Sequence, residues 1–286
     1  MFIITCLDLG FAPPSNAYLR EKDLNSPELY LPLKVKVCDH CWLVQTEDYA
    51  DAKTFFTPEY SYFSSTSSSW VLHAQQYTKK IISDLGLTEK SYVIEVASND
   101  GYLLKNFVEA SIPCLGIEPT DSTAQEAEKL NIPVLREFFT EDVGKRLAKK
   151  GKKSDLIIGN NVYAHVPKIN DFTRGLKAAL KPGGTITLEF PHLMRLIELT
   201  QFDTIYHEHF SYLSFTSVNI IFEKNNLEIF DVEKLTTHGG SLRVYAKRKG
   251  SKAYEKTSRV KDLLDLEEER GMKDKKIYLD FKNNID

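Results

Sequence analysis

Across residues 58–250, short apolar runs alternate with longer segments whose apolar positions recur every three or four residues. The short runs predict buried strands, and the longer segments predict amphipathic helices. Strands and helices that alternate in this way are typical of a parallel sheet covered on both faces. The strand-like runs are SYVIEVA (91–97), CLGIEPT (114–120), IPVLREFF (132–139), DLIIGNN (155–161) and TITLEF (185–190), and the helix-like segments are GYLLKNFVEA (101–110), TAQEAEKL (123–130) and FTRGLKAALK (172–181), the last ending at Pro182-Gly183-Gly184.

The end of this region follows a different pattern. EIFDVEKL (228–235) and SLRVYAKR (241–248) are strand-like runs joined by Thr-Thr-His-Gly-Gly, with no helix between them. A short connection with glycine between two such runs is typical of an antiparallel hairpin. A mostly parallel sheet closed by an antiparallel hairpin is the architecture of class I methyltransferase domains, whereas Rossmann dehydrogenases lack that hairpin. We therefore predict an α/β fold with a Rossmann-like sheet of seven strands over residues 58–250.

The flanking segments have other compositions. Residues 1–57 are rich in Pro, Tyr and Leu, contain the pair Cys38 and Cys41, and predict a small N-terminal lobe. Residues 251–286 are strongly charged, and we interpret them as a solvated helix. The apolar positions that would share one side of that helix are Val260, Leu263, Leu264 and Leu266.

Composition and charge exclude several classes of protein. The chain has 286 residues, of which 42% are hydrophobic and 27% are charged, as in ordinary globular domains. A net charge of −3 provides no basic field for nucleic acid or an anionic membrane. The apolar runs are too short to span a bilayer, and no secretory signal pattern is present. We expect a cytoplasmic monomer with reduced cysteines and without nucleic-acid or membrane partners.

The first strand–turn–helix unit is where α/β sheets usually bind a cofactor. A pyrophosphate needs the pattern G-x-G-x-x-G, but only Gly101 is present in this turn. Carboxylates at Glu95 and Asp100 suit a cation better, which favours S-adenosylmethionine with its sulfonium and ammonium groups. Glu118 ends the second strand, where a carboxylate can accept both ribose hydroxyls.

The full set of predicted cofactor residues includes two asparagines that end the fourth strand, beside the expected methionine moiety. Any one of these positions alone fits a turn or a cap, because Asn and Asp favour turns for their own reasons. Acidic residues at two successive strand ends, together with the terminal hairpin, favour the cofactor interpretation. The set is Glu95, Ser98, Asp100, Gly101, Glu118, Asn160 and Asn161.

The run Tyr206-His207-Glu208-His209-Phe210 collects two histidines, a carboxylate and a phenol in the aromatic context QFDTIYHEHFSYLSF. Surface loops rarely collect aromatic residues and core segments rarely collect ionisable ones, so the run is typical of a pocket wall where protons move. In an extended segment, His207 and His209 would share one face. Two other interpretations stay open: a half-buried strand with locally satisfied polar tips, and a metal site at the two histidines.

Five segments together resemble the sugar-nucleotide C-methyltransferases of deoxysugar biosynthesis. These enzymes use S-adenosylmethionine to methylate carbon 3 of a thymidine-diphosphate-linked 4-keto-deoxysugar. The resemblance covers about residues 7–285 and implies a zinc-binding lobe, a class I methyltransferase core and a C-terminal Rossmann-like domain. The segments are VIEVASNDGYLLKNF (93–107), GNNVYAHVPKINDF (159–172), LEFPHLMRLI (188–197), QFDTIYHEHFSYLS (201–214) and THGGSLRVYA (237–246).

The chain departs from this family in its cysteines. The family holds zinc with two Cys-x-x-Cys pairs, but only Cys38-Asp39-His40-Cys41 is present, and a structural zinc takes four ligands. Cys6 or His40 could complete a site, although neither matches the family pattern. A lone redox Cys-x-x-Cys is the weaker alternative, because redox pairs of the thioredoxin type sit at a helix start in another fold.

The chain also stops near Asp286, before the family's final domain. We therefore expect a polypeptide shortened at both ends. Residues 1–57 would be the remnant of the zinc-binding lobe, residues 58–250 the methyltransferase core, and residues 251–286 the charged helical start of a missing C-terminal domain.

Methylation of a carbon next to a ketone needs a base for the α-proton and a donor for the enolate oxygen. The resemblance implies His209 as the base, with Glu208 and Tyr206 shaping and polarising the site. It also implies His165, just after the fourth strand, as an acid–base partner or enolate stabiliser. As a loop histidine, His165 could instead cap a carbonyl.

The resemblance further implies a tyrosine that reaches the sugar from the lobe junction, which is Tyr60 or Tyr62; Tyr62 is the candidate that we carry forward. The predicted substrate is a nucleotide-linked 4-keto-deoxysugar. Two alternatives remain: an N- or O-methyltransferase of a small molecule, which demands less of its base, and an inactive remnant that still binds S-adenosylmethionine.

Overall fold

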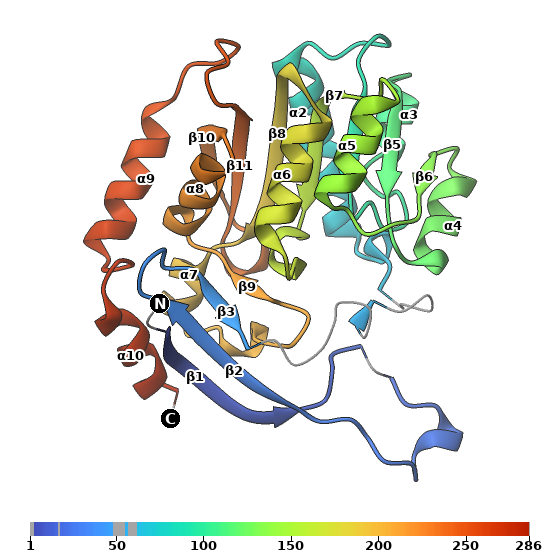
Figure 1. Cartoon of the computed structure of the whole chain (residues 1–286). Helices are drawn as coiled ribbons and strands as arrows, with labels where there is room; N and C mark the ends of the chain where they lie inside the picture. The colour runs from blue at the N-terminus through green and yellow to red at the C-terminus, as the bar shows by residue number, and fades with distance from the viewer. Residues whose placement is uncertain (1–2, 17, 48–54, 57–61, 286) are drawn as a thin grey trace.

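The computed structural model describes residues 3–16, 18–47, 55–56 and 62–285 (Figure 1). The strands of its larger sheet are β4 (Val93–Val96), β5 (Cys114–Ile117), β6 (Val134–Leu135), β7 (Ser154–Asn160), β8 (Leu180–Pro191), β10 (Leu227–Leu235) and β11 (Ser241–Arg248). They lie in the order β10-β11-β8-β7-β4-β5-β6. The strands from β6 to β8 are parallel, and β11 runs antiparallel to both β8 and β10. The predicted sheet with its terminal hairpin is confirmed.

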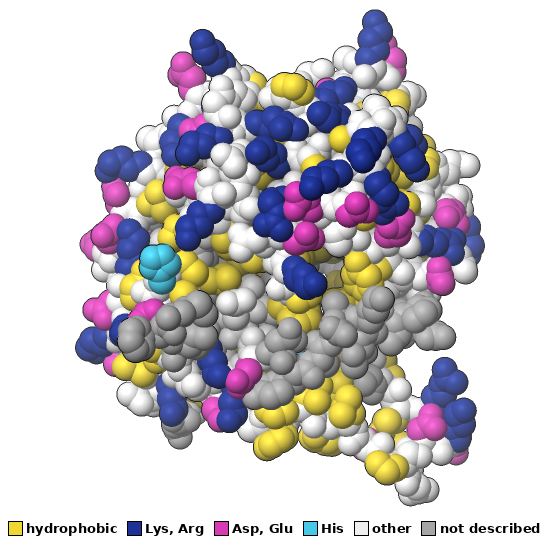
Figure 2. Space-filling view, viewed as in Figure 1, with side chains coloured by type: hydrophobic (Ala, Val, Ile, Leu, Met, Phe, Trp, Pro, Cys, Tyr) yellow, Lys and Arg dark blue, Asp and Glu magenta, His cyan; other side chains and the backbone are white. Residues whose placement is uncertain are grey.

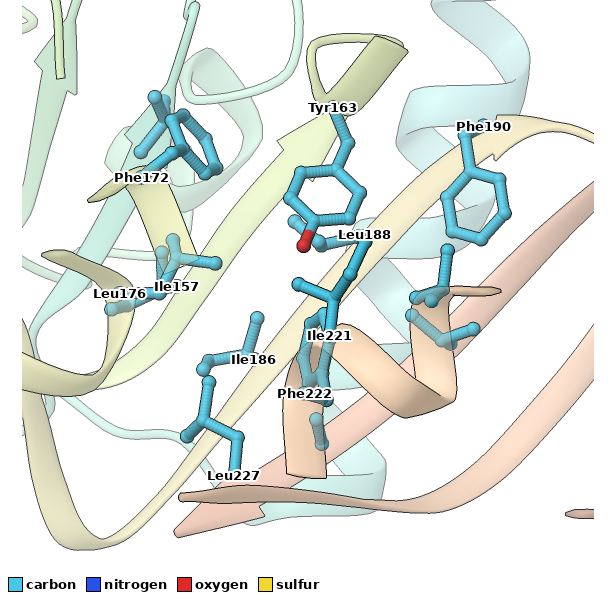
Figure 3. Packing of buried hydrophobic residues seen from close by; sticks show 14 of the residues in the cluster. Ile157, Tyr163, Phe172, Leu176, Ile186, Leu188, Phe190, Ile221, Phe222 and Leu227 are labelled. Carbon is cyan, nitrogen blue, oxygen red and sulfur yellow. The ribbon is translucent and has the colours of Figure 1, made fainter. Parts of the chain in front are cut away.

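Helices cover both faces of this sheet. They are α2 (Ser68–Leu85), α3 (Lys105–Glu109), α4 (Asp121–Lys129), α5 (Glu141–Lys149), α6 (Ile169–Ala179), α8 (Phe215–Lys224) and α9 (Ser258–Glu269). Two more helices, α7 (Leu193–Glu198) and α10 (Lys275–Asn283), pack instead in the apolar core of the N-terminal lobe. In β7, Ile157 packs towards α5, α6 and α8, while Leu156 and Ile158 pack towards α2 and α3. Figure 3 shows the first of these clusters, with Tyr163 and Phe222 among its members. Burial on both faces explains why the strand-like runs are continuously apolar.

A second, antiparallel sheet forms the N-terminal lobe. Its order is β1 (Ile3–Ala12), β2 (Leu31–Cys38), β3 (Val44–Thr46) and β9 (Ser211–Tyr212). The strand β9 comes directly after the run 206–210, so this sheet joins the lobe to the core. The lobe's apolar core also contains Met272, Tyr278 and Phe281. The predicted lobe is therefore present, but residues from the second half of the chain complete it.

The interpretation of residues 251–286 as a solvated helix is wrong. Val260 and Leu263 of α9 are buried against the core, and Tyr278 and Phe281 of α10 are buried in the lobe. The segment is amphipathic, as its apolar positions predicted. Burial of those positions fixes both helices, while most of the charged side chains occupy their outward faces.

One predicted boundary is also wrong. The helix α6 ends at Ala179 and β8 begins at Leu180, so Pro182 and Gly183 lie within a strand and not after a helix. Pro182 disfavours helical geometry at the preceding residue, and Leu180 is buried and pairs with Ser154. Among the described helices, none is long and apolar enough to cross a membrane.

Candidate active site

A cavity of about 870 Å³ opens at the carboxyl ends of the parallel strands, between the core and the N-terminal lobe. In α/β sheets, this edge is the usual place for a ligand. In the space-filling view, apolar side chains lie in the recess between lobe and core, and Lys and Arg side chains gather above it (Figure 2). Eight of the predicted site residues line the cavity: Tyr62, Glu118, Asn160, Asn161, His165, Tyr206, Glu208 and His209. Tyr60 lies outside the described residues.

The turn after β4 has an unusual backbone. Ala97, Asn99 and Gly101 all have positive φ, at 57°, 48° and 80°. A side chain at Gly101 would also place its Cβ 2.5 Å from the Cδ1 of Ile132, so this position requires glycine. Left-handed geometry at alternate positions bends the chain sharply at the strand end, and Ala97 and Asn99 line the cavity.

Glu118 connects this turn to the next one. Its carboxylate accepts hydrogen bonds from the backbone N–H of Asn99 at 2.9 Å and from the N–H and hydroxyl of Thr120 at 3.0 and 2.6 Å. Burial raises the pKa of Glu118, although these hydrogen bonds oppose the shift. Each carboxylate oxygen can accept more than one hydrogen bond, so Glu118 can still receive a ligand hydroxyl.

Four predicted cofactor residues lie behind the cavity wall. Glu95 is fully buried, and burial, reinforced by Asp100 and Glu118, raises its pKa well above the ordinary value. Asp100 accepts from the backbone N–H groups of Ser65 and Tyr102. Gly101 provides the positive φ that the turn needs. The Ser98 hydroxyl occupies the space that a Cβ on Gly116 would need.

The asparagines at the end of β7 do face the cavity. Asn160 is buried, and among the described residues neither atom of its amide nor Oδ1 of Asn161 has a hydrogen-bond partner. Buried polar atoms without partners are costly unless a ligand or water satisfies them. These atoms, together with Glu118, therefore fit a polar cofactor that carries hydroxyl and ammonium donors.

Tyr206 and His209 meet across a tight turn. The backbone N–H of His209 donates to the carbonyl of Tyr206 at 3.0 Å. The Nδ1–H of His209 donates to the carbonyl of Thr204 at 3.0 Å, which leaves Nε2 as the acceptor of the Tyr206 hydroxyl at 2.8 Å. Burial, reinforced by His165, lowers the pKa of His209 well below the histidine range. His209 is thus held as a neutral imidazole with a defined tautomer.

The turn contradicts the prediction that His207 and His209 share one face. His207 points into the lobe, where its Nε2 lies 3.1 Å from the carbonyl of Pro32 and its ring stacks on Phe55. The extended-strand argument fails because the chain reverses at these residues. His207 and His209 therefore do not form a common metal site.

His165 lies next to His209 in the cavity wall, with ring centroids 4.6 Å apart. Its Nδ1 donates to the backbone carbonyl of Glu208 at 2.9 Å, so His165 does cap a carbonyl. That bond leaves Nε2 as the basic nitrogen. Burial lowers the pKa of His165 to about 4. Two neutral imidazoles thus stand side by side at the same end of the cavity.

Glu208 connects this group to the N-terminal lobe. The Ser15 hydroxyl and the Asn16 amide donate to its Oε1 at 2.8 and 3.0 Å, and its side chain is almost completely buried. Asn16 itself lines the cavity. Sequence reasoning missed both lobe residues, because nothing in the segment PPSNAY indicates a contact with a residue about 190 positions away.

Two aromatic residues of the cavity wall were missed as well. Trp70 of α2 stacks on His73 and meets the edge of His238, and both Trp70 and His238 line the cavity. The segment THGGSLRVYA contains His238, so its presence among the resembling segments was the available signal. The helix that carries Trp70 gave no such signal.

Among the described residues, Cys38 and Cys41, the two predicted metal ligands, are not joined by further ligands into a four-ligand zinc site. Cys38 and Cys41 lie at the end of β2, and although burial opposes it, hydrogen bonds from backbone N–H groups of Cys41 and His40 lower the pKa of the Cys38 thiol. Cys6 instead donates its thiol to the carbonyl of Val35, and burial raises its pKa to about 12. Within the described ranges, no cluster of three or more His, Cys, Asp or Glu could hold a metal ion.

The strand order with its antiparallel terminal hairpin defines the class of fold, that of class I methyltransferase domains, and the cavity lies where such sheets bind a ligand. Three family models match the chain. They are a "Putative zinc binding domain" over residues 2–56, a "Methyltransferase domain" over residues 70–232 and a "C-methyltransferase C-terminal domain" over residues 236–286. Because the second of these models spans more than half of the chain, the chain belongs to the family of methyltransferase domains.

The chain is similar to the C-methyltransferase NovU of Streptomyces niveus, with 31% identity over 275 residues. The match covers 96% of this chain but 65% of that protein, so the chain spans less than two thirds of its relative's length. Among solved structures, the PH0226 protein of Pyrococcus horikoshii OT3 matches 66% of this chain and 95% of its own, with 14% identity and a TM-score of 0.54. At that identity, the likeness concerns the fold alone.

Proposed function

We propose that this protein transfers a methyl group from S-adenosylmethionine to a carbon next to a ketone, on a nucleotide-linked 4-keto-deoxysugar. The observation that carries the proposal is the pairing of Tyr206 with His209 beside His165, at one end of the cavity. Methyl transfer to nitrogen or oxygen has little need of such a group. Removal of a carbon-bound proton requires an unprotonated base, such as a neutral imidazole, and nearby hydrogen-bond donors.

The cofactor would be held at the other end of the cavity. Glu118 would accept hydrogen bonds from its ribose hydroxyls, and the side-chain amides of Asn160 and Asn161 would form hydrogen bonds with its methionine moiety. Bound S-adenosylmethionine supplies an electrophilic methyl group. The turn at Ala97 and Asn99 brings backbone close to this region, while Asp100 acts from behind the wall by holding the backbone N–H groups of Ser65 and Tyr102.

The proton would be taken by His209, either directly or through the hydroxyl of Tyr206. Because Nδ1 of His209 is bound to the Thr204 carbonyl, the acquired proton would reside on Nε2, where Tyr206 is the neighbour. Because Nδ1–H of His165 already donates to the Glu208 carbonyl, its basic Nε2 would act as a second proton acceptor, the acid–base partner of His209. Glu208, held by Ser15 and Asn16, would fix the turn that carries Tyr206 and His209.

Tyr62 would complete the site from the lobe side. Its backbone carbonyl accepts from the amide of Asn99 at 3.0 Å, and the neighbouring Ser64 N–H donates to the same side chain at 2.8 Å. The turn after β4 therefore fixes the segment that carries Tyr62 at the cavity edge. Its ring is half exposed, at 49%, and is available to a substrate.

Deuterium exchange tests the proposal without methyl transfer. The protein would be incubated in deuterated water with a 4-keto sugar nucleotide and S-adenosylhomocysteine, and deuterium next to the ketone would be followed by NMR. His209→Asn should slow exchange by about 10²–10⁴-fold while leaving cofactor affinity intact. His207→Asn is the control, because His207 is two residues from His209 but its ring points into the lobe. Exchange at the wild-type rate in His209→Asn would exclude His209 as the base.

A further inference from the structure

Tyr206 and His209, two of the residues proposed to move protons, lie in one long loop of the chain. After β8 the chain leaves the core at His192 and returns at Phe215, the first residue of α8. The base of this loop is closed by the N–H of Leu193, which donates to the carbonyl of Leu213 at 3.0 Å, and by a bridge between His192 and Leu213. The loop of residues 193–213 is therefore a single unit with two adjacent ends.

A single carboxylate holds both ends of this loop. Oε1 of Glu267, on α9, accepts from Nε2 of His192 and from the backbone N–H of Phe215, each at 2.6 Å. Its Oε2 accepts from the N–H of Thr216, also at 2.6 Å. Glu267 is completely buried and His192 is 2% exposed. Glu267 thus binds the residue before the loop and caps the helix after it.

The loop's path fixes the Tyr206–His209 geometry. Within the loop, the carbonyl of Thr204 holds Nδ1 of His209, and the backbone N–H of Tyr206 donates to the hydroxyl of Tyr212 at 3.2 Å. Tyr212 adjoins Leu213 at one of the ends that Glu267 holds, and its hydroxyl carries that position to Tyr206 in the middle of the loop. A shift of either end would move the Nε2 of His209 relative to a bound substrate.

We infer that Glu267 is a positioning residue for proton removal, acting through the two ends of the loop 193–213. This inference rests on the proposed function. It means that α9, which carries Glu267, contributes to the geometry of the active site. The cofactor residues sit on the turns after β4, β5 and β7, which Glu267 does not touch. Loss of Glu267 should therefore separate proton removal from cofactor binding.

The experiment compares Glu267→Gln, Glu267→Ala and the control Glu268→Gln, a neighbour whose exposed side chain pairs with Lys273. Glu267→Gln keeps the size but turns one acceptor into a donor that faces a backbone N–H. We expect substrate deuterium exchange to fall by about 10–100-fold in both Glu267 variants, because displacement of catalytic groups by about 1 Å costs this much. Affinity for S-adenosylhomocysteine should stay within about twofold.

Two further measurements keep the inference falsifiable. Amide hydrogen exchange followed by mass spectrometry should speed up in residues 193–224 of Glu267→Gln and stay unchanged in residues 93–118. His192→Gln, whose amide can still donate to Glu267, should retain substrate exchange, whereas His192→Leu should lose it.

Wild-type rates in both Glu267 variants would overturn the inference, and so would equal losses of cofactor affinity and substrate exchange, which would indicate general destabilisation. If the wild-type protein itself exchanges no deuterium, the proposed function fails. In that case, local amide exchange still reports whether Glu267 holds the loop.

Discussion

The hydroxyl of Tyr206 donates to Nε2 of His209 at 2.8 Å, across a single turn of the backbone. Because Nδ1 of His209 already donates to a carbonyl, this phenol is the neighbour of the basic nitrogen. A substrate proton can therefore reach His209 only by displacing the Tyr206 hydroxyl or by passing through it. In the proposed reaction, either route would give Tyr206 a part.

Tyr206→Phe tests that part. Removal of the hydroxyl should slow deuterium exchange next to the ketone by about 10–100-fold, because a positioned proton-transfer group is lost while the imidazole remains. Tyr245→Phe is the matched control, since its phenol also donates to a side chain, Glu233, but lies outside the cavity lining. Faster exchange in Tyr206→Phe would show that the hydroxyl only blocks His209.

The pH dependence of deuterium exchange should reflect the lowered pKa values of His165 and His209. Burial lowers the pKa of His165 to about 4 and that of His209 well below the ordinary value. A base must be unprotonated to accept a proton, so exchange should persist below pH ~6.5, where an ordinary histidine becomes protonated. A half-maximal rate near pH 6.5 would contradict the assignment of either histidine as the base.

The same shift predicts how stability changes with pH. Between pH ~6.5 and about 4, the unfolded chain binds protons at these histidines while the folded protein does not. The free energy of unfolding should therefore decrease as the pH falls through this range. Urea titrations at several pH values should show a weaker decrease in the free energy of unfolding for His165→Asn than for the wild-type protein.

Glu118→Ala should weaken the binding of S-adenosylmethionine. Each lost charge-assisted hydrogen bond to a ribose hydroxyl costs about 1.5–3 kcal/mol, or roughly 10–100-fold in affinity. The carboxylate also holds the N–H of Asn99, so part of the loss would come from the turn itself. Calorimetry can compare this variant with Glu126→Ala on α4. Unchanged affinity in Glu118→Ala would mean that the ribose is held elsewhere.

We expect weak or absent zinc in this chain. Cys38 and Cys41 provide two thiols, and the Cys6 thiol is directed to the carbonyl of Val35. Elemental analysis after dialysis against a chelator measures the bound metal directly. Stoichiometric zinc, lost in Cys38→Ser, would contradict this expectation and show that other residues complete the site.

The core sheet was predictable because its strands are recognisable locally. Apolar runs such as 156–158 are buried on both faces, and the connection through Gly239 and Gly240 has the composition of a hairpin. The strand-end residues Glu118, Asn160 and Asn161 followed from the same logic, since parallel strands end at one edge. These predictions depended only on nearby sequence.

The arrangement inside the site was not predictable in this way. The position of His207 depends on a chain reversal that no glycine or proline marks, and the partners of Glu208 lie at Ser15 and Asn16. The burial of α9 depends on its contacts with α8 and β10, which the charge pattern concealed. In each case, contacts between distant residues override what the neighbouring sequence favours.

The sheet of the N-terminal lobe has a consequence for the order in which the molecule forms. Strands β1, β2 and β3 are synthesised early, but β9, which pairs with β3, and the buried side chains of α10 emerge near residues 211 and 281. Sheets built from distant segments close slowly, because the intervening chain must be confined first. During synthesis the core can therefore assemble before the lobe, and the cavity acquires its second wall only when α10 has left the ribosome.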